Sequence, residues 1–371
     1  MRTSSNRLPG NVFLLLLCMA LCSVASKTKA QDSTAASGIE MSGFVDAYYS
    51  KNFAKPATRV NKLRNFDVAE NQFNLSLAEL VVQKKAGPVG FRFDLDFGST
   101  NDLVQPGNAS TLSVLQQGYL TAVLPVGEGL TVDAGKFVTH MGNEVIESKD
   151  NWNYSRSLLF AWAIPYYHTG IRLAYPVSSA FTAAVHVVNG WNSGTDNNDF
   201  KSLGCTLNYA LTGSTGIIVN AMDGFENLTA IENGKRTVFD FIITHQLTES
   251  FSVVLNGDYG QAGTTSGLAI WKGAALYGRY LITPKYAVAL RGEIFDDPQG
   301  YATGLGISKL DVKEITGTYE YKFADALLLR GELRYDFSNA PAFDKKASAT
   351  TTGVGTESNQ LTVLLAGVVI F

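Results

Sequence analysis

The stretch LLLRGELRYDF at residues 327–337 alternates between two kinds of side chain. Its odd-numbered positions are leucine, glycine, tyrosine or phenylalanine, and four of its five even-numbered positions are ionised. Because successive side chains of a strand point to opposite faces, this segment predicts a strand with one apolar face and one charged face. A sheet in a soluble protein can show the same alternation, so one strand does not decide the class of protein.

The class of protein is indicated by the repetition of this alternation along the chain. The segments FRFDLDF (91–97), FSVVLNGDY (251–259) and ITGTYEYKF (315–323) also alternate, and the chain ends in LTVLLAGVVIF (361–371). After the N-terminal segment, no apolar stretch approaches the roughly 20 residues that a membrane helix needs. Any membrane span must therefore come from strands closed into a barrel, because an open sheet would leave backbone groups unpaired in hydrocarbon. The pattern is typical of an all-β, antiparallel, up-and-down transmembrane barrel.

The connections between these segments alternate between tight and long. Seven connections are expected to be tight turns, most of which contain Gly or Pro. Eight are expected to be longer and polar, at about 54–71, 98–114, 139–167, 190–201, 223–235, 261–269, 296–310 and 338–358. Fifteen connections predict about sixteen strands, with a range of 14 to 18. Short turns are expected to face the periplasm, together with both termini, and long loops the outside. Sixteen strands would enclose an aqueous lumen.

The N-terminus has the features of an export signal. Residues 1–30 combine Arg2 and Arg7, a short apolar run and small residues, which predicts a secretory signal peptide cleaved after Ala30, with Ser26 as the second choice. A lipid anchor on Cys22 is disfavoured. Residues 31–38 are a short polar lead segment, and residues 39–371 are the barrel.

Charge and cysteine content exclude some classes of partner. Without residues 1–30 the chain has 26 basic and 33 acidic residues, a net charge of about −7. It has no basic stripe, so no nucleic-acid partner is expected. Cys205 is then the single cysteine, which excludes an intramolecular disulfide.

The ionised face of the strands is expected to line the lumen. Positive and negative side chains are interspersed, which predicts a solvated network of ion pairs rather than a ring of one sign that selects a particular ion. The predicted lumen wall includes Arg92, Asp94, Asp96, Arg172, Arg279, Arg291, Glu293, Arg330, Glu332, Arg334 and Asp336.

The third long connection, at about 139–168, has an unusual composition. It mixes tryptophan, tyrosine and phenylalanine with charged residues, and such a segment needs a surface to pack on. We expect it to fold into the lumen and narrow the channel; an external lid or partner-binding loop is the alternative. The predicted pore constriction comprises Glu147, Lys149, Asp150, Trp152 and Arg156.

No metal, cofactor or catalytic site is expected. His140 and His168 flank the third connection, but neither a carboxylate nor a cysteine completes a ligand motif. The loop at 192–199 lacks the spacing of a calcium loop. No nucleophile elbow, phosphate-binding loop or HExxH motif occurs.

Several segments together resemble the OmpL-like family of β-barrel porins, which is named β-barrel porin family 2. They are GFVDAYY (43–49), NQFNLSLAEL (71–80), AGPVGFRFDLDFG (86–98) and the long stretch at 130–178 that contains the third connection. The resemblance covers the chain beyond the signal peptide and implies an outer-membrane barrel with a pore function. It assigns neither a solute nor catalytic residues.

The sequence therefore predicts a bacterial outer-membrane porin that lets small hydrophilic solutes diffuse passively. The alternative is a surface receptor or adhesin whose external loops bind a partner. Expected partners are outer-membrane lipid and lipopolysaccharide, the solutes, and the barrel-assembly machinery, which would recognise the terminal Phe371. A second copy of the barrel is a further candidate partner, since three barrels can associate into a homo-trimer.

Overall fold

The computed structural model describes residues 38–371 except residues 86, 106–110 and 227–233. The predicted signal peptide at 1–30 lies outside the described residues, as does all but the last residue of the polar lead segment at 31–38.

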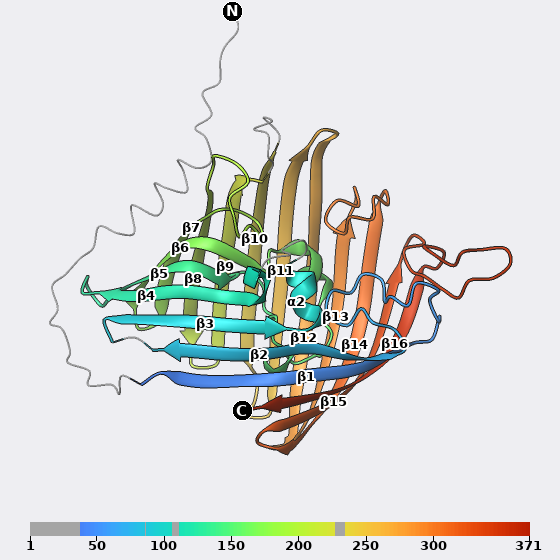
Figure 1. The fold of residues 1–371 in the computed structure, drawn as a ribbon, viewed down its shortest axis with the longest axis horizontal. Helices are drawn as coiled ribbons and strands as arrows, with labels where there is room; N and C mark the ends of the chain where they lie inside the picture. Colours follow the sequence, from blue (N-terminus) through green and yellow to red (C-terminus); the bar gives the residue numbers. More distant parts are fainter. Residues whose placement is uncertain (1–37, 86, 106–110, 227–233) are drawn as a thin grey trace, which may run out of the picture.

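The described residues form a closed barrel of sixteen antiparallel strands, so the predicted fold is confirmed. Each strand pairs with its neighbours in the chain, and β1 pairs with β16 to close the barrel. In Figure 1 the strands of the near wall, β1 to β5, cross those of the far wall, because barrel strands are tilted. The strands are β1 (Glu40–Asn52), β2 (Gln72–Lys84), β3 (Val89–Phe97), β4 (Leu115–Leu124), β5 (Leu130–Val138), β6 (Tyr167–Ser178), β7 (Phe181–Val188), β8 (Ser202–Thr212), β9 (Thr215–Phe225), β10 (Lys235–Gln246), β11 (Phe251–Thr264), β12 (Gly267–Thr283), β13 (Tyr286–Asp297), β14 (Leu310–Ala324), β15 (Leu327–Ser338) and β16 (Asn359–Ile370).

All seven tight connections occur where the sequence predicts them, and they form one end of the barrel, here named the short-turn end. The opposite end is named the long-loop end. One predicted long connection, 261–269, is wrong, because β11 continues to Thr264 and β12 begins at Gly267. Backbone pairing extends this hairpin through a stretch of polar and small residues, so side-chain polarity did not mark where its strands end.

The outer face of the barrel is apolar. Leu290, Leu333 and Leu365 point outward and are 60%, 53% and 63% exposed, whereas the next residues of two of these strands, Arg291 and Arg334, are almost fully buried. This alternation places the apolar side chains where lipid would contact them. None of the helices in the described ranges is long and apolar enough to cross a membrane.

The barrel closes through its C-terminal residue. The backbone N–H and C=O of Phe371 both pair with Gly43, at 3.0 and 2.9 Å. A Cβ atom on Gly43 would lie 2.3 Å from the backbone oxygen of Glu79 and 2.7 Å from the ring of Phe371, so this close approach of strand and ring needs glycine. Gly43 of the GFVDAYY segment thus leaves room for the Phe371 ring.

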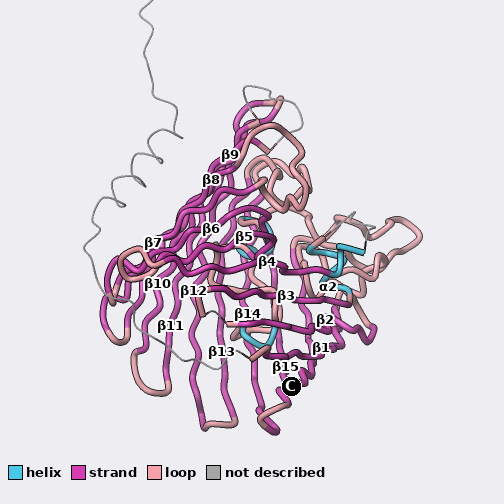
Figure 2. The backbone as a smooth tube through the Cα atoms, turned by 60° about the vertical axis from the view of Figure 1, so that its left-hand side comes forward, coloured by secondary structure: helices cyan, strands magenta, loops and turns pink. Residues whose placement is uncertain are grey.

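The core of the molecule lies inside the barrel. Residues 139–166, which join β5 to β6, fill the interior and are named here the internal loop; they include η2 (Ser148–Asp150) and η3 (Leu159–Ala163), and Figure 2 shows helical turns enclosed by the strands. Tyr154, Leu158 and Leu159 are fully buried. Tyr154 donates a hydrogen bond of 2.9 Å to Asp46, an inward residue of β1. The β1–β2 connection covers the loop, and its Phe66 ring packs 5.7 Å from that of Phe160.

Further connections meet at the long-loop end. The short helix α2 (Ser99–Val104) belongs to the β3–β4 connection and contacts β2 and β3. The β1–β2 and β15–β16 connections, blue and red in Figure 1, lie side by side, since backbone hydrogen bonds of 3.0 Å join Ala57 to Lys345 and Lys346 to Ala54.

Candidate functional site: the lumen and its internal loop

Carboxylates of the barrel wall bind the backbone of the internal loop. Glu293 on β13 accepts hydrogen bonds from the N–H groups of Leu158 and Leu159, both at 2.6 Å. Glu332 on β15 accepts from Tyr154 and from the residue after it, at 2.6 and 3.0 Å. A buried segment outside the sheet must find partners for its backbone groups, and here charged wall side chains supply them.

Arginines of the same wall bind the carbonyl groups of the loop. Arg330 donates to the carbonyl of Asn151 at 2.8 Å, and Arg291 donates to that of Ser155 at 2.7 Å. Strands β13 and β15 therefore hold both the donors and the acceptors of the loop backbone, which fixes its path across the lumen.

Buried ion pairs connect these wall residues. Arg291 pairs with Glu314 at 2.6 Å and with Glu144 of the loop at 2.7 Å, while Arg334 and Arg64 both pair with Asp336 at 2.8 Å. The expectation of a solvated wall is wrong on this side of the lumen, because the internal loop and the β1–β2 connection cover it. Removing one partner of such a pair would leave an uncompensated buried charge.

The opposite wall keeps part of its charge in contact with solvent. Arg92 pairs with Asp94 at 2.8 Å and Arg172 with Asp133 at 2.6 Å, and the two arginine side chains are 31% and 27% exposed. Next to the loop-binding strands, Arg279 on β12 also keeps part of its charge in solvent; it pairs with Glu320 of β14 at 2.8 Å and is 28% exposed in its side chain. This part of the wall resembles the predicted network.

Acidic side chains meet where the tip of the internal loop approaches β2 and β3. Burial raises the pKa of Glu147 in the loop, and the carboxylate of Asp94 raises it further. Asp96 is fully buried, and neither of its carboxylate oxygens accepts a hydrogen bond within the described part of the chain. Glu79 is buried beside it and 4% exposed. The loop tip is therefore held close to a wall of the same charge.

Three of the five predicted constriction residues, Lys149, Asp150 and Trp152, line cavities at the short-turn end. Glu147 lies beside the acidic residues of β2 and β3. Lys149 pairs with Asp150, which is 55% exposed in its side chain. Arg156 is the exception, being 4% exposed; it donates to the carbonyl of Tyr154 at 2.6 Å. Arg156 does not border an opening, because its guanidinium binds carbonyl groups of the loop itself.

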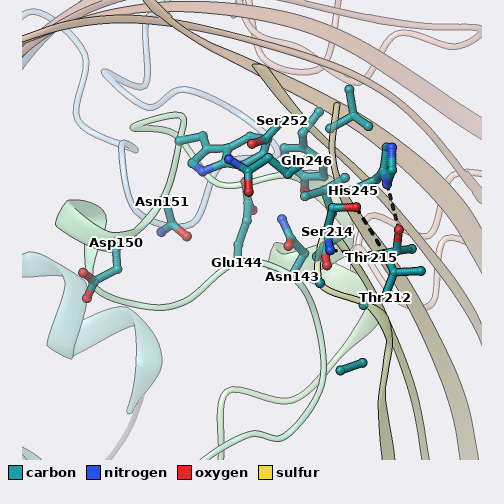
Figure 3. Close-up of a pocket in the computed structure, with 18 residues that line it drawn as sticks. Asn143, Glu144, Asp150, Asn151, Thr212, Ser214, Thr215, His245, Gln246 and Ser252 are labelled. Carbon is teal, nitrogen blue, oxygen red and sulfur yellow. Dashed lines mark hydrogen bonds between the residues drawn. The ribbon is translucent and has the colours of Figure 1, made fainter. Parts of the chain in front are cut away.

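Two cavities lie between the loop and the barrel at the short-turn end. The larger has a volume of about 490 Å³, and Figure 3 shows the loop residues Asn143, Glu144, Asp150 and Asn151 across from Thr212, Ser214, Thr215 and His245 of the wall. The smaller, of about 300 Å³, is lined by Glu79, Arg92, Lys149, Asp150 and Phe371 among others. Asp150 lines both cavities, so it is the charge best placed to act on ions at this end.

A third cavity, of about 480 Å³, lies at the long-loop end and is named here the aromatic vestibule. Its lining includes Asn65, Asp102, Trp162, Tyr166, Tyr167, Trp191, Asn192, Arg236, Trp271 and Tyr301. Sequence reasoning missed this cavity, because the loops other than the third are rich in Gly, Ser, Thr, Asn and Asp. Single aromatic residues in those loops, Trp191 in NGWNSG and Tyr301 in PQGYATG, were the signal that could have found it.

His140 and His168, which flank the internal loop, contact neighbouring parts of the barrel. His168 bonds the carbonyl of Gly190 at 3.1 Å, and the ring of His140 stacks 3.9 Å from that of His186. Within the described residues, no group of three or more His, Cys, Asp or Glu side chains could hold a metal ion.

Solved structures with a similar fold include an outer membrane channel, a porin and an outer membrane protein. The outer membrane channel DcaP of Acinetobacter baumannii has a TM-score of 0.59 at 13% identity and covers 93% of this chain and 100% of its own. An anion-selective porin from Comamonas acidovorans has a TM-score of 0.59 at 12% identity, covering 90% and 99%. The trimer form of OmpT, an outer membrane protein of Vibrio cholerae, has a TM-score of 0.58 at 10% identity, also covering 90% and 99%. At these identities the likeness shows the fold alone.

No curated protein matches the chain. A family model does, over residues 38–371, and its description is "Putative beta-barrel porin-2, OmpL-like". The match spans the whole barrel, including the segments that suggested the resemblance. The chain therefore belongs to the OmpL-like family of β-barrel porins.

Proposed function

We propose that this protein is a bacterial outer-membrane channel for the passive diffusion of small hydrophilic solutes. The observation that carries the proposal is the closed sixteen-strand barrel whose lumen holds a charged loop, with cavities at both ends. A sixteen-strand barrel is wide enough for an aqueous channel, and a loop across it sets the size of solute that passes. A porin family and a porin-like fold favour a channel over an enzyme.

The orientation and partners belong to the same proposal. Residues 1–30 direct export, the short-turn end faces the periplasm, and the long-loop end faces outside. The apolar outer face contacts lipid and lipopolysaccharide, and Phe371 is the assembly signal for the barrel-assembly machinery. The trimer form of OmpT supports association of three barrels.

Glu147, Lys149, Asp150 and Trp152 form the constriction in this proposal. A charge at a narrow, partly desolvated point acts more strongly on an ion than one on an open wall. Asp150→Lys should therefore shift selectivity towards anions. Asp325→Lys, in the exposed β14–β15 turn, is the matched control and should leave selectivity unchanged.

Single-channel recording in planar bilayers tests the function. Purified protein should give ohmic conductance steps, and reversal potentials in a salt gradient should move towards anion selectivity in Asp150→Lys only. Silence of the folded barrel at high protein load would overturn the channel and favour a receptor. Conductance steps of Asp150→Lys with the same ion selectivity as the parent would show that Asp150 is not part of the constriction.

A further inference from the structure

The aromatic vestibule gathers aromatic rings from separate parts of the chain. Three of the four tryptophans line it: Trp162 from the internal loop, Trp191 from the β7–β8 connection and Trp271 from β12. Tyr301 joins them from the β13–β14 connection. Closing the barrel does not require tryptophans to converge at this end.

The rings are held in fixed positions. Trp271 donates its indole N–H to the carbonyl of Ala163 at 3.0 Å, and its ring occupies space left by Gly260, where a Cβ atom would lie 2.0 Å from it. Tyr301 stacks on Trp271 with ring centroids 5.8 Å apart at 23°, and Trp191 meets Trp271 edge-on at 6.2 Å and 89°. A site whose side chains are already ordered binds with a smaller entropy cost.

The positively charged side chain of Arg236 lies among these aromatic rings. Its guanidinium lies 4.5 Å from the ring centre of Trp191 and 5.4 Å from that of Tyr301, and it donates a 2.6 Å hydrogen bond to the Tyr301 hydroxyl. Its Nε atom is buried and has no hydrogen-bond partner within the described residues. Arg236 as a whole is half-buried, and a guanidinium has five N–H donors, so N–H groups besides the one bonded to Tyr301 can donate to a ligand oxygen.

Trp271 is buried and anchors the other rings, so the apolar faces within reach of a ligand are those of the half-buried Trp162, Trp191 and Tyr301. Charged and amide side chains lie beside them. A pyranose sugar has C–H groups that pack on aromatic faces and a rim of hydroxyls that donate and accept. Asn65 Nδ2 and Asn192 Oδ1 already bond the internal loop, so Asn65 Oδ1, Asn192 Nδ2, Asp102 and Arg236 are the groups for that rim. An inorganic anion would match Arg236 alone, and an aromatic acid would leave the carboxylate and amides without partners.

We propose that the aromatic vestibule is a binding site for sugars. The inference rests on the proposed channel function and names its solute class: a sugar is captured at the long-loop end before it passes the internal loop. A volume of about 480 Å³ is within the range of small-molecule sites.

Calorimetric titration of the purified, folded barrel tests the proposal. The ligands are glucose, galactose, N-acetylglucosamine and maltotriose, with benzoate and sodium sulfate as the competing chemistries. At least one sugar should bind saturably and more tightly than benzoate or sulfate. Trp191→Ala should weaken that affinity about tenfold, because it removes an aromatic face. Phe200→Ala, in the same connection as Trp191 but outside the lining of the vestibule, is the matched control and should bind as the parent does.

Arg236→Gln provides a second variant should Trp191→Ala fail to fold, and it should also weaken sugar binding. Failure of all four sugars to bind, tighter binding of benzoate or sulfate, or unchanged affinity in the vestibule variants would overturn the inference. Conductance of the same preparations separates the two proposals. Ohmic steps without sugar binding leave the channel intact and remove the sugar site, whereas a silent barrel that binds sugar removes the channel.

Discussion

At the scale of single residues, successive side chains of one strand lie in different surroundings: one on the outer face of the barrel, the next in its interior. Leu333 is exposed on the outer face, whereas Glu332 and Arg334 are buried against the internal loop. The same strand thus contacts lipid on one side and organises a protein core on the other. Substitutions at adjacent positions should therefore fail for different physical reasons.

Leu333→Arg tests the lipid-facing side. An arginine near the middle of a bilayer costs about 2 to 4 kcal/mol, so this variant should lower the fraction of folded, heat-modifiable protein in outer membranes. Leu333→Phe keeps the face apolar and should fold as the parent does. Equal folded fractions for the two variants would mean that Leu333 does not face lipid.

Glu332→Ala tests the side that binds the loop. The change leaves the N–H groups of Tyr154 and Ser155 without their acceptor, at a cost of about 1 to 3 kcal/mol each. We expect a lower thermal unfolding temperature and noisier single-channel current as the loop moves. Leu329→Ala, an outward position of the same strand, is the control and should leave the current trace quiet. A quiet trace in Glu332→Ala as well would show that the loop does not depend on this carboxylate.

At the scale of elements, the first and last strands meet through the end of the chain. Phe371 pairs with Gly43 beyond the last residue of β16, so the terminal residue adds two backbone hydrogen bonds to barrel closure. Its ring lies over a position where only glycine leaves room. The terminal residue thus has a structural role in addition to the proposed recognition by the assembly machinery.

Deleting Phe371 should lower the folded fraction, measured by heat-modifiable mobility in outer-membrane preparations. Phe371→Tyr keeps the ring and both backbone bonds, so it should assemble normally. Gly43→Val should also lower the folded fraction, because its side chain would clash with the backbone oxygen of Glu79 and displace the Phe371 ring. An undiminished folded fraction after the deletion would count against both roles of Phe371.

At the scale of the whole molecule, the barrel has its core where an open porin would hold water. The internal loop supplies Tyr154, Leu158 and Leu159 to that core, and the wall supplies charged groups that bind its backbone. The loop therefore both stabilises the interior and limits the free cross-section.

Replacing residues 145–162 with a short Gly/Ser linker should separate these two contributions. We expect larger single-channel conductance and entry of larger sugars in liposome swelling, because the obstruction is gone while the strand pairing is untouched. The unfolding temperature should fall, because Arg330, Glu293 and Glu332 lose their loop partners. A folded variant with unchanged conductance and size limit would place the loop outside the conducting path.

The sequence by itself determined the class of fold, the family and the direction of most side chains, and it predicted about sixteen strands within a range of 14 to 18. The reason is that strand alternation has a period of two residues and is local, so Leu333 and Arg334 can be assigned to opposite faces without knowledge of the rest of the chain. The tight turns were equally readable, because Gly, Pro and short polar segments act locally. The hairpin at 261–269 was misread because polarity does not report pairing there.

The tertiary structure alone decided what the inward side chains do. Whether Arg334 meets water or a loop carbonyl depends on residues 139–166, far away in sequence, and Arg156 turned out to bind its own loop rather than border an opening. The aromatic vestibule depends on Trp162, Trp191, Trp271 and Tyr301, which only the closed barrel brings together. These contacts join residues that are far apart in the sequence, and no short-range sequence pattern relates them. The candidate sites are therefore defined only in the folded molecule.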